Sequence, residues 1–117
     1  MVDAIGRKEK KKALDLYYDL LMLKEPAMRI LFLITRHFQI LMQLREMAGG
    51  GFDYKSMASK VGVPEFAVRK YTGQARAFDS LRLEEIMREC VQTEENIKTG
   101  QMGDQLAVEL LIISTMQ

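Results

Sequence analysis

Apolar residues recur at spacings of three and four along nearly the whole chain, which is the period of amphipathic α-helices. No segment alternates apolar and polar residues as a half-buried strand would. Glycines and the two prolines divide this pattern into six segments, because glycine ends helices and proline suits their first turn. The predicted helices cover about residues 8–23, 26–47, 53–61, 64–77, 80–98 and 104–116. We therefore expect an all-α fold, a compact bundle of about five to six helices.

Two of these segments carry more apolar residues than one buried stripe requires. The first half of the segment over 26–47 is apolar nearly all round, which is typical of a central helix covered on several sides. The last segment is similar, so it either contacts a partner on a second side or lies at the centre of the core. For a subunit interface, the candidate residues are Leu106, Val108, Leu110, Leu111, Ile112 and Ile113.

The segment over 56–76 has the spacing of a helix-turn-helix unit. Ala58 is small where the second helix would cross the first, Gly62 would form the turn, and Val68 would pack into the angle between the helices. The second helix would present side chains of types that reach phosphates and base edges, namely Arg69, Lys70, Gln74 and Arg76. Crossed helices also occur in purely structural domains, so the motif leaves DNA binding and helix packing both open.

Two phenylalanines bracket the second helix of this unit. Phe66 and Phe78 are twelve residues apart, which places them about 120° apart around a helical path. We expect different roles for them because one straight face would not hold both. Phe66 should pack at the outer edge of the helix crossing, and Phe78 should anchor the following connection against the main helix over 26–47.

Acidic and basic residues are nearly equal in number, but they are unevenly distributed along the chain. Seventeen Lys and Arg residues meet sixteen Asp and Glu residues, for a net charge of +1. Residues 53–78 carry five basic side chains against two acidic ones, whereas residues 79–117 carry eight acidic side chains against three basic ones. A polyanion would therefore meet the middle of the chain and not its end.

The inventory of reactive side chains argues against an enzyme. His37 is the only histidine and Cys90 the only cysteine, and we expect a hydrogen-bonded core or rim histidine and a small packing cysteine. The glycine run at 49–51 lacks the lysine and hydroxyl residue of a phosphate loop. Adjacent acidic residues such as Glu84 and Glu85 point in different directions on a helix. No catalytic, cofactor-binding or metal-binding residue is predicted.

Size and composition indicate one ordinary soluble domain. At 117 residues, with 48% hydrophobic and 28% charged residues, the chain can bury a core of its own. One cysteine excludes an internal disulfide, and no signal peptide is visible. The longest apolar run has five residues, at 30–34, against roughly 20 for a membrane span. We expect a cytoplasmic protein without a membrane helix.

Four blocks of sequence carry a resemblance to a known family. They are residues 2–6 with 13–14, 36–39 with 41, 63–70 with 74–76 and 78, and 97–100 with 106–111. In their order and spacing they resemble the C-terminal domain of the bacterial DNA polymerase III delta subunit, a component of the sliding-clamp loader. The chain departs from the family pattern at Glu94, where an aspartate is usual, and in the looser connector at 49–51.

The resemblance implies a role in subunit assembly during DNA replication. In the family, two AAA+ domains precede this one and the first grips the clamp, so residues 1–7 would be a junction from a missing upstream domain. Residues 8–117 would be the helical collar domain, which joins the C-terminal domains of the other clamp-loader subunits in a ring. The clamp would be contacted only through the upstream domains, and DNA would be a further partner in the full complex.

The resemblance also implies that the delta protein itself catalyses nothing, although the holoenzyme is a polymerase. The helix-turn-helix spacing belongs to the family pattern as well, which makes DNA reading by this motif less favoured. The alternative is a helix-turn-helix DNA-binding regulator, for which Arg69, Lys70 and Arg76 are the candidate DNA contacts.

Overall fold

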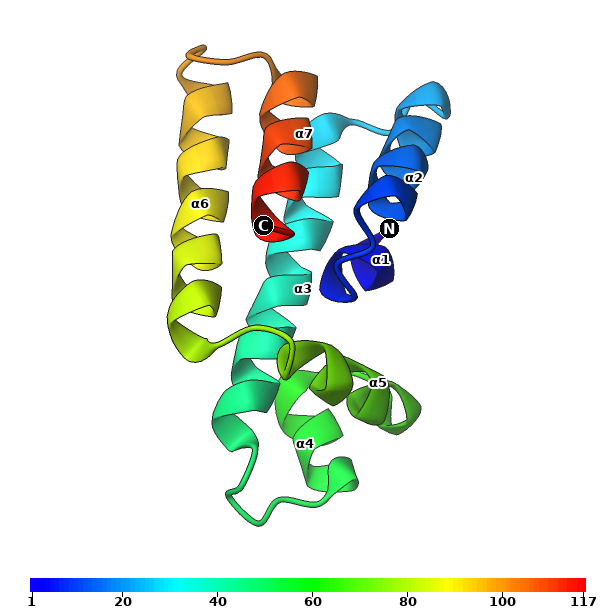
Figure 1. Ribbon diagram of the computed structural model, residues 1–117, viewed down its shortest axis with the longest axis vertical. Coiled ribbons are helices and arrows are strands. Elements are labelled where there is room, and N and C mark those ends of the chain that lie inside the picture. The colour runs from blue at the N-terminus through cyan, green and yellow to red at the C-terminus, as the bar shows by residue number, and fades with distance from the viewer.

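The computed structural model describes residues 1–117 as seven α-helices without strands (Figure 1). The helices are α1 (Val2–Gly6), α2 (Lys10–Met22), α3 (Ala27–Met47), α4 (Tyr54–Val61), α5 (Glu65–Ala75), α6 (Ser80–Lys98) and α7 (Asp104–Thr115). The all-α prediction is confirmed, and all six predicted helices are present within a few residues of their expected bounds. None of the seven has the length and hydropathy needed to cross a membrane.

The long helix α3 is the axis of the molecule. Its first half lies in a bundle with α2, α6 and α7, and its second half carries the crossed pair α4 and α5 (Figure 1). The molecule is elongated along this axis, with extents of 44 × 26 × 23 Å. Because α3 contacts α1, α4, α5, α6 and α7, its apolar residues are needed on several sides. This confirms the prediction of a central helix, but Phe32 and Leu33 in its first half are 66% and 44% exposed, so the helix is not covered on every side.

The additional helix α1 lies within residues 1–7, the segment interpreted above as a junction. Ala4 and Ile5 are buried in the main core, and Gly6 lies directly against the side chain of Gln74 on α5. The segment is therefore packed onto the helical body. Its role as a junction to an upstream domain stays a prediction.

The buried apolar residues form two clusters. The main core contains eighteen buried residues from α1, α2, α3, α6 and α7, with Ala75 and Phe78 from the end of α5 and its following turn. The small core contains six residues: Ile40, Leu44, Met57, Ala58, Val61 and Val68. The small core holds α4 and α5 onto the second half of α3, and it contains the Ala58 and Val68 predicted to pack at the helix crossing.

The two phenylalanines have the contrasting positions that the sequence predicts. Phe78 is 1% exposed, and its ring packs edge-on against that of Phe38 in α3, with 5.5 Å between ring centroids. This confirms its place as an anchor against the main helix. Phe66 is 83% exposed at the start of α5. It lies outside the crossing and belongs to neither core, so the prediction that it packs there is wrong.

The ends of the helices follow from local chemistry. The carboxylate of Asp53 accepts a hydrogen bond of 2.8 Å from the backbone N–H of Ser56, and Asp79 accepts one of 2.7 Å from that of Arg82. These contacts satisfy backbone donors that a first helical turn leaves free. Gly62 ends α4 with φ of +82°, a left-handed conformation that favours glycine, and so forms the predicted turn.

Candidate interaction surfaces

The interface residues predicted on α7 separate into two groups. Val108, Leu111 and Ile112 are buried in the main core, because α7 packs against α2, α3 and α6 at once. They are therefore unavailable to a partner in the folded chain, and the interpretation of α7 as a central core helix holds for them. Leu106 and Leu110 are 52% and 45% exposed.

Ile113 completes an outward stripe on α7 with these two leucines. The three residues follow one another at spacings of four and three, so they lie on one helix face, and Ile113 is half-buried there. We call Leu106, Leu110 and Ile113 the α7 stripe. Leu110 also lines a groove of about 200 Å³ between α6 and α7, whose other lining includes Met102 and polar side chains of α6. The α7 stripe is the part of the predicted interface that a partner can reach.

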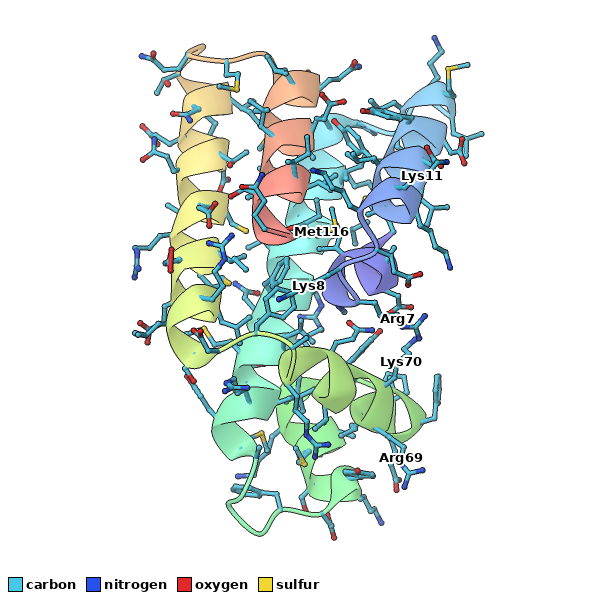
Figure 2. All side chains as sticks on the ribbon, viewed as in Figure 1. Arg7, Lys8, Lys11, Arg69, Lys70 and Met116 are labelled. Atoms are coloured by element: carbon cyan, nitrogen blue, oxygen red, sulfur yellow. The ribbon has the colours of Figure 1, made fainter.

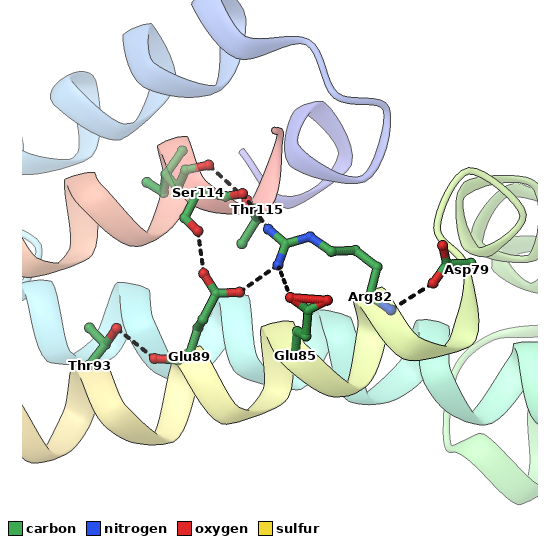
Figure 3. A network of polar contacts seen from close by, with 8 residues as sticks. Asp79, Arg82, Glu85, Glu89, Thr93, Ser114 and Thr115 are labelled. Carbon is green, nitrogen blue, oxygen red and sulfur yellow. Dashed lines mark hydrogen bonds and ion pairs between the residues drawn. The ribbon is translucent and has the colours of Figure 1, made fainter.

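An ionic network fixes the C-terminal end of α7 against α6 (Figure 3). The guanidinium of Arg82 lies 2.8 Å from a carboxylate oxygen of Glu89 and 3.5 Å from one of Glu85. Arg82 also donates to the backbone carbonyl of Ser114, and the Ser114 hydroxyl donates to Glu89. The sequence spacing of Arg82, Glu85 and Glu89 along α6 could have indicated these ion pairs. The contacts with Ser114 could not be predicted in this way, because they depend on how α7 packs against α6.

Two tyrosines attach α2 to the other side of α7. The hydroxyl of Tyr17 donates a 2.7 Å hydrogen bond to the backbone carbonyl of Gln105, and that of Tyr18 donates to the carboxylate of Glu109. Burial, with the charges of Glu109 and Asp104, raises the pKa of Tyr17 to about 12. Both hydroxyls therefore stay protonated as donors at neutral pH. With α6 on one side and α2 on the other, the α7 stripe is held in one orientation.

The side chains predicted to contact DNA on α5 are not equivalent. Arg69 and Arg76 are exposed, but the ammonium group of Lys70 lies 3.1 Å from the carboxylate of Asp3 on α1. Gln74, predicted to face a nucleic acid, is buried, and this part of the prediction is wrong. Helix periodicity alone missed this because the partner of Gln74 is α1, a helix that the sequence pattern did not indicate.

Gln74 is the centre of a partly buried polar relay from α3 to α1. His37 Nε2 and Gln74 Oε1 are 2.7 Å apart, and the amide nitrogen of Gln74 donates at 3.0 Å to the Asp3 carboxylate. Because Gln74 Oε1 can only accept, His37 Nε2 carries the proton and donates. Lys70 supplies the last contact, to the second oxygen of Asp3. We call His37, Gln74, Asp3 and Lys70 the α1 relay.

Electrostatics in the α1 relay favour a neutral histidine and a charged aspartate. Burial lowers the pKa of His37, against the smaller raising effects of the Gln74 contact and the Asp3 charge. Burial alone would raise the pKa of Asp3, but hydrogen bonds from Gln74 and Lys70 and the Lys70 charge outweigh it and lower this pKa. Near neutral pH each of the three contacts in the relay therefore pairs a donor with an acceptor. His37 is a hydrogen-bonded buried histidine, as predicted.

The remaining reactive group is also in the core. Cys90 is buried among the main-core side chains, which confirms it as a packing residue, and burial raises the pKa of its thiol. No three side chains of His, Cys, Asp or Glu converge as metal ligands. Exposed large apolar side chains lie on the α7 stripe, on the edge of α4 and α5, around the start of α3 and on α6.

Comparison with known proteins gives one consistent result. Residues 1–115 match the family model described as the DNA polymerase III delta subunit, C-terminal domain. The chain is 28% identical over 117 residues to DNA polymerase III subunit delta of Bacillus subtilis, covering 100% of this chain and 34% of that protein.

A solved structure agrees with the sequence match. The Bacillus subtilis DNA clamp loader delta protein is similar with a TM-score of 0.87 and 29% identity, over 98% of this chain and 34% of the other. The chain thus spans about a third of the length of the relatives it matches. The family match includes α1 and ends at the last residue of α7, so it takes in both the α7 stripe and the edge of α4 and α5.

Proposed function

The chain belongs to the family formed by the C-terminal domain of the DNA polymerase III delta subunit, and from that premise we propose that it is the subunit-assembly, or collar, module of a clamp loader. Its partners are the C-terminal domains of the other clamp-loader subunits. Its mechanism is the burial of an apolar helix face against those neighbours, in support of sliding-clamp loading during DNA replication. The module itself performs no chemical step.

The observation that carries this proposal is the α7 stripe. Leu106 and Leu110 are large apolar side chains one helical turn apart, and both are about half exposed although the helix that carries them is packed into the core. Exposed apolar residues gathered on one face are typical of protein interfaces, whereas scattered single ones are not. Burying them on association would remove apolar surface from water at roughly 25 cal/mol per Å².

The surroundings of the stripe support a preformed interface. The Arg82 network fixes one flank of α7, and the Tyr17 and Tyr18 hydroxyls fix the other. A helix held on both flanks loses little freedom when a partner binds, so less of the burial energy is spent on ordering. Polar side chains at the seams, such as Glu89 and Glu109, would form the rim around an apolar centre.

Substitution of the stripe tests the proposal. The double variant Leu106→Ser with Leu110→Ser should fold, because neither side chain is in the core, and should weaken association with the other loader subunits about tenfold or more. Binding would be measured by interferometry with those subunits immobilised. The matched control is Leu81→Ser with Val91→Ser, two exposed apolar residues on α6.

The two double variants give distinct outcomes. Weak association in the α7 variant, with normal association in the α6 variant, is the expected result. Equal association of both variants with the parent, at unchanged thermal stability, would show that the stripe is not the assembly surface.

A further inference from the structure

The groove beside the α7 stripe is one end of a longer furrow along the seam between α6 and α7. Near the turn that joins the two helices, the lining of the groove includes Met102 and Leu110. Toward the C-terminal end of α7 an open depression follows, which has no apolar residue in its lining. The two hollows share Glu89, Gln92 and Ser114, and we call them together the α6–α7 furrow. The furrow is thus apolar at one end and polar at the other.

Contacts within the chain fix the walls of the groove. The side-chain amide of Gln92 donates a 2.9 Å hydrogen bond to that of Asn96, one turn further along α6. The Thr93 hydroxyl donates at 2.7 Å to the backbone carbonyl of Glu89 in the same helix. The backbone N–H of Met102 donates at 3.2 Å to the carbonyl of Asn96, which holds the methionine beside the groove. The groove is therefore preformed in the free chain, and a partner would not have to order it.

The side-chain charges of the furrow compensate one another. Its lining contains two arginines and two glutamates. The guanidinium of Arg82 pairs with the carboxylates of both Glu85 and Glu89, and the Ser114 hydroxyl donates to the other oxygen of Glu89. Arg88 is the one arginine of the lining that forms no ion pair. A charged partner would gain little here, whereas an uncharged side chain would displace no ion pair by entering the groove.

The apolar end of the furrow has room for one large side chain. The groove measures about 200 Å³, and a cavity of roughly 150 Å³ is large enough to hold a benzene ring. Met102 forms part of its wall, and the thioether of methionine makes favourable contacts with aromatic rings. Leu110 belongs to both the groove and the α7 stripe. A partner that covers the stripe therefore reaches the groove at the same time.

We propose that the groove receives one aromatic side chain, a phenylalanine or tyrosine, from a helix of a neighbouring clamp-loader subunit, and that this anchor fixes where the neighbour lies on α7. The proposal rests on the assembly role argued above and names the chemistry of the partner at that surface. Aromatic side chains that fill a pocket near the centre of an interface commonly supply a large share of the binding energy. The neighbour's helix would place aliphatic side chains over the rest of the α7 stripe and uncharged polar ones over the polar end of the furrow.

Other kinds of occupant fit the furrow less well. An acidic partner would be attracted elsewhere, because in Figure 2 the labelled basic side chains lie on the side formed by α2, α1 and α5, away from α6: Lys11, Arg7, Lys70 and Arg69. Residues 79–117, which include both walls of the furrow, carry eight acidic side chains against three basic ones. A small-molecule ligand usually has most of its surface buried, whereas the furrow is open along the seam. The observations therefore favour a protein helix with an apolar anchor.

Filling the groove from within tests the anchor. Thr93→Phe places a ring in the groove from the α6 wall, whereas the matched control Thr93→Val removes only the hydroxyl and keeps the size of the side chain. Thr93 is half-buried and belongs to neither core, so both variants should fold, which thermal unfolding verifies. Thr93→Phe should weaken association with the other loader subunits about tenfold or more, and Thr93→Val should change it less than about twofold. Interferometry with the immobilised subunits measures both.

A second variant reaches the groove from the turn after α6. Met102→Glu introduces a charge beside the space for the ring, and Met102 belongs to neither core, so the fold should be retained. Association should again weaken about tenfold or more, because burying this carboxylate against a ring is unfavourable. The matched control is Met22→Glu, at a methionine that is 81% exposed at the end of α2, and it should leave association unchanged.

Salt separates an apolar anchor from attraction between charges. Between about 0.1 and 1 M salt the Debye length falls from about 10 to 3 Å, so contacts between exposed charges weaken. Because the charges of the furrow are already compensated, the dissociation constant should change less than about threefold over this range. Arg88→Glu, which reverses the unpaired charge of the lining, should change it as little.

The results distinguish this proposal from the assembly role. Normal association of Thr93→Phe and Met102→Glu, together with weak association of the α7 stripe double variant, would overturn the anchor and leave the assembly role standing. A dissociation constant that rises about tenfold or more over the salt range would also overturn the anchor, because charge would then position the neighbour. Equally strong association of the chain with itself, measured by sedimentation, would overturn it by making a second copy the occupant. Absence of association in the parent would overturn both proposals.

Discussion

The two ends of α3 support their neighbours in different ways. Mainly around its first half, eighteen buried residues join α1, α2, α3, α6, α7 and the end of α5, and polar contacts connect α7 to α6 and to α2. Around its second half, six buried residues hold α4 and α5. The α4–α5 pair therefore depends more on single contacts at its junction with the bundle, especially Phe78 and the α1 relay. Regions with few buried apolar contacts open locally at lower free energy, so the pair should be the less stable part.

Removing the ring of Phe78 should lower the stability of the fold more than any other substitution considered. Phe78→Ala deletes a fully buried side chain that packs on Phe38 at the boundary between the two parts, and it should lower the free energy of unfolding by about 3 to 5 kcal/mol. Urea denaturation followed by circular dichroism measures this. Phe78→Leu, which keeps most of the buried volume, should cost clearly less. A Phe78→Ala protein as stable as the parent would mean that the junction does not rest on this ring.

A Val→Ala substitution in each core compares the stability of the two regions directly. Val68 in the small core and Val108 in the main core are both completely buried, so Val→Ala removes the same atoms from each, at a cost of roughly 2 kcal/mol. Hydrogen exchange should nevertheless distinguish them. Val68→Ala should reduce protection mainly in α4 and α5, whereas Val108→Ala should reduce it throughout the bundle. Identical protection patterns would show that the molecule opens as one unit.

The structure also shows which features could be predicted from the sequence. Periodicity found every helix of eight residues or more, because each buries a continuous apolar face. The same reasoning placed Ala58, Gly62, Val68 and Phe78 correctly, since their roles depend on contacts set by local spacing. On α7, periodicity could not separate Val108 from Leu110, because which side faces the core depends on where α2 and α6 lie.

The α1 relay was beyond sequence reasoning for a related physical reason. Asp3 and Gln74 are polar residues seventy-one positions apart, and nothing in their own segments marks them as partners. Helix α1 has only five residues, too few to display a helical period. The exposure of Phe52 and Tyr54 was also missed, because an aromatic residue looks the same in sequence whether it is buried or exposed. Their place beside Phe66 follows only from the angle between α4 and α5.

Replacing Gly6, which lies beside the α1 relay, should lower the free energy of unfolding by an intermediate amount. A Cβ atom at Gly6 would lie 2.0 Å from Gln74 Oε1, so Gly6→Ala forces the amide away from His37 and Asp3. We expect a loss of roughly 1.5 kcal/mol, toward the low end for overpacked sites because the end of the glutamine side chain can tilt. Denaturation of Gly6→Ala in a Gln74→Ala background gives the comparison. The cost of Gly6→Ala should nearly vanish there, and an unchanged cost would place the clash elsewhere.

Acid should weaken the attachment of α1 through His37. The folded state holds the pKa of His37 below its ordinary value of 6.5, so the unfolded chain binds a proton more readily. The stability from neutral His37 is complete above about pH 6.5 and is lost as the pH falls through the lower, folded-state pKa. His37→Gln should flatten this part of the profile in urea denaturation at a series of pH values. A profile that keeps its slope in His37→Gln would assign the acid sensitivity to other groups.

The smallest effect on stability should come from the most exposed aromatic ring. Phe66 is 83% exposed and belongs to neither core, so Phe66→Ala removes almost no buried surface, and alanine is also the better helix former at this position in α5. The free energy of unfolding should stay within about 0.5 kcal/mol of the parent, as for other surface substitutions away from special contacts. Thermal unfolding of Phe66→Ala beside Phe78→Ala tests the contrast directly. A loss comparable to that of Phe78→Ala would mean that Phe66 packs against the folded chain.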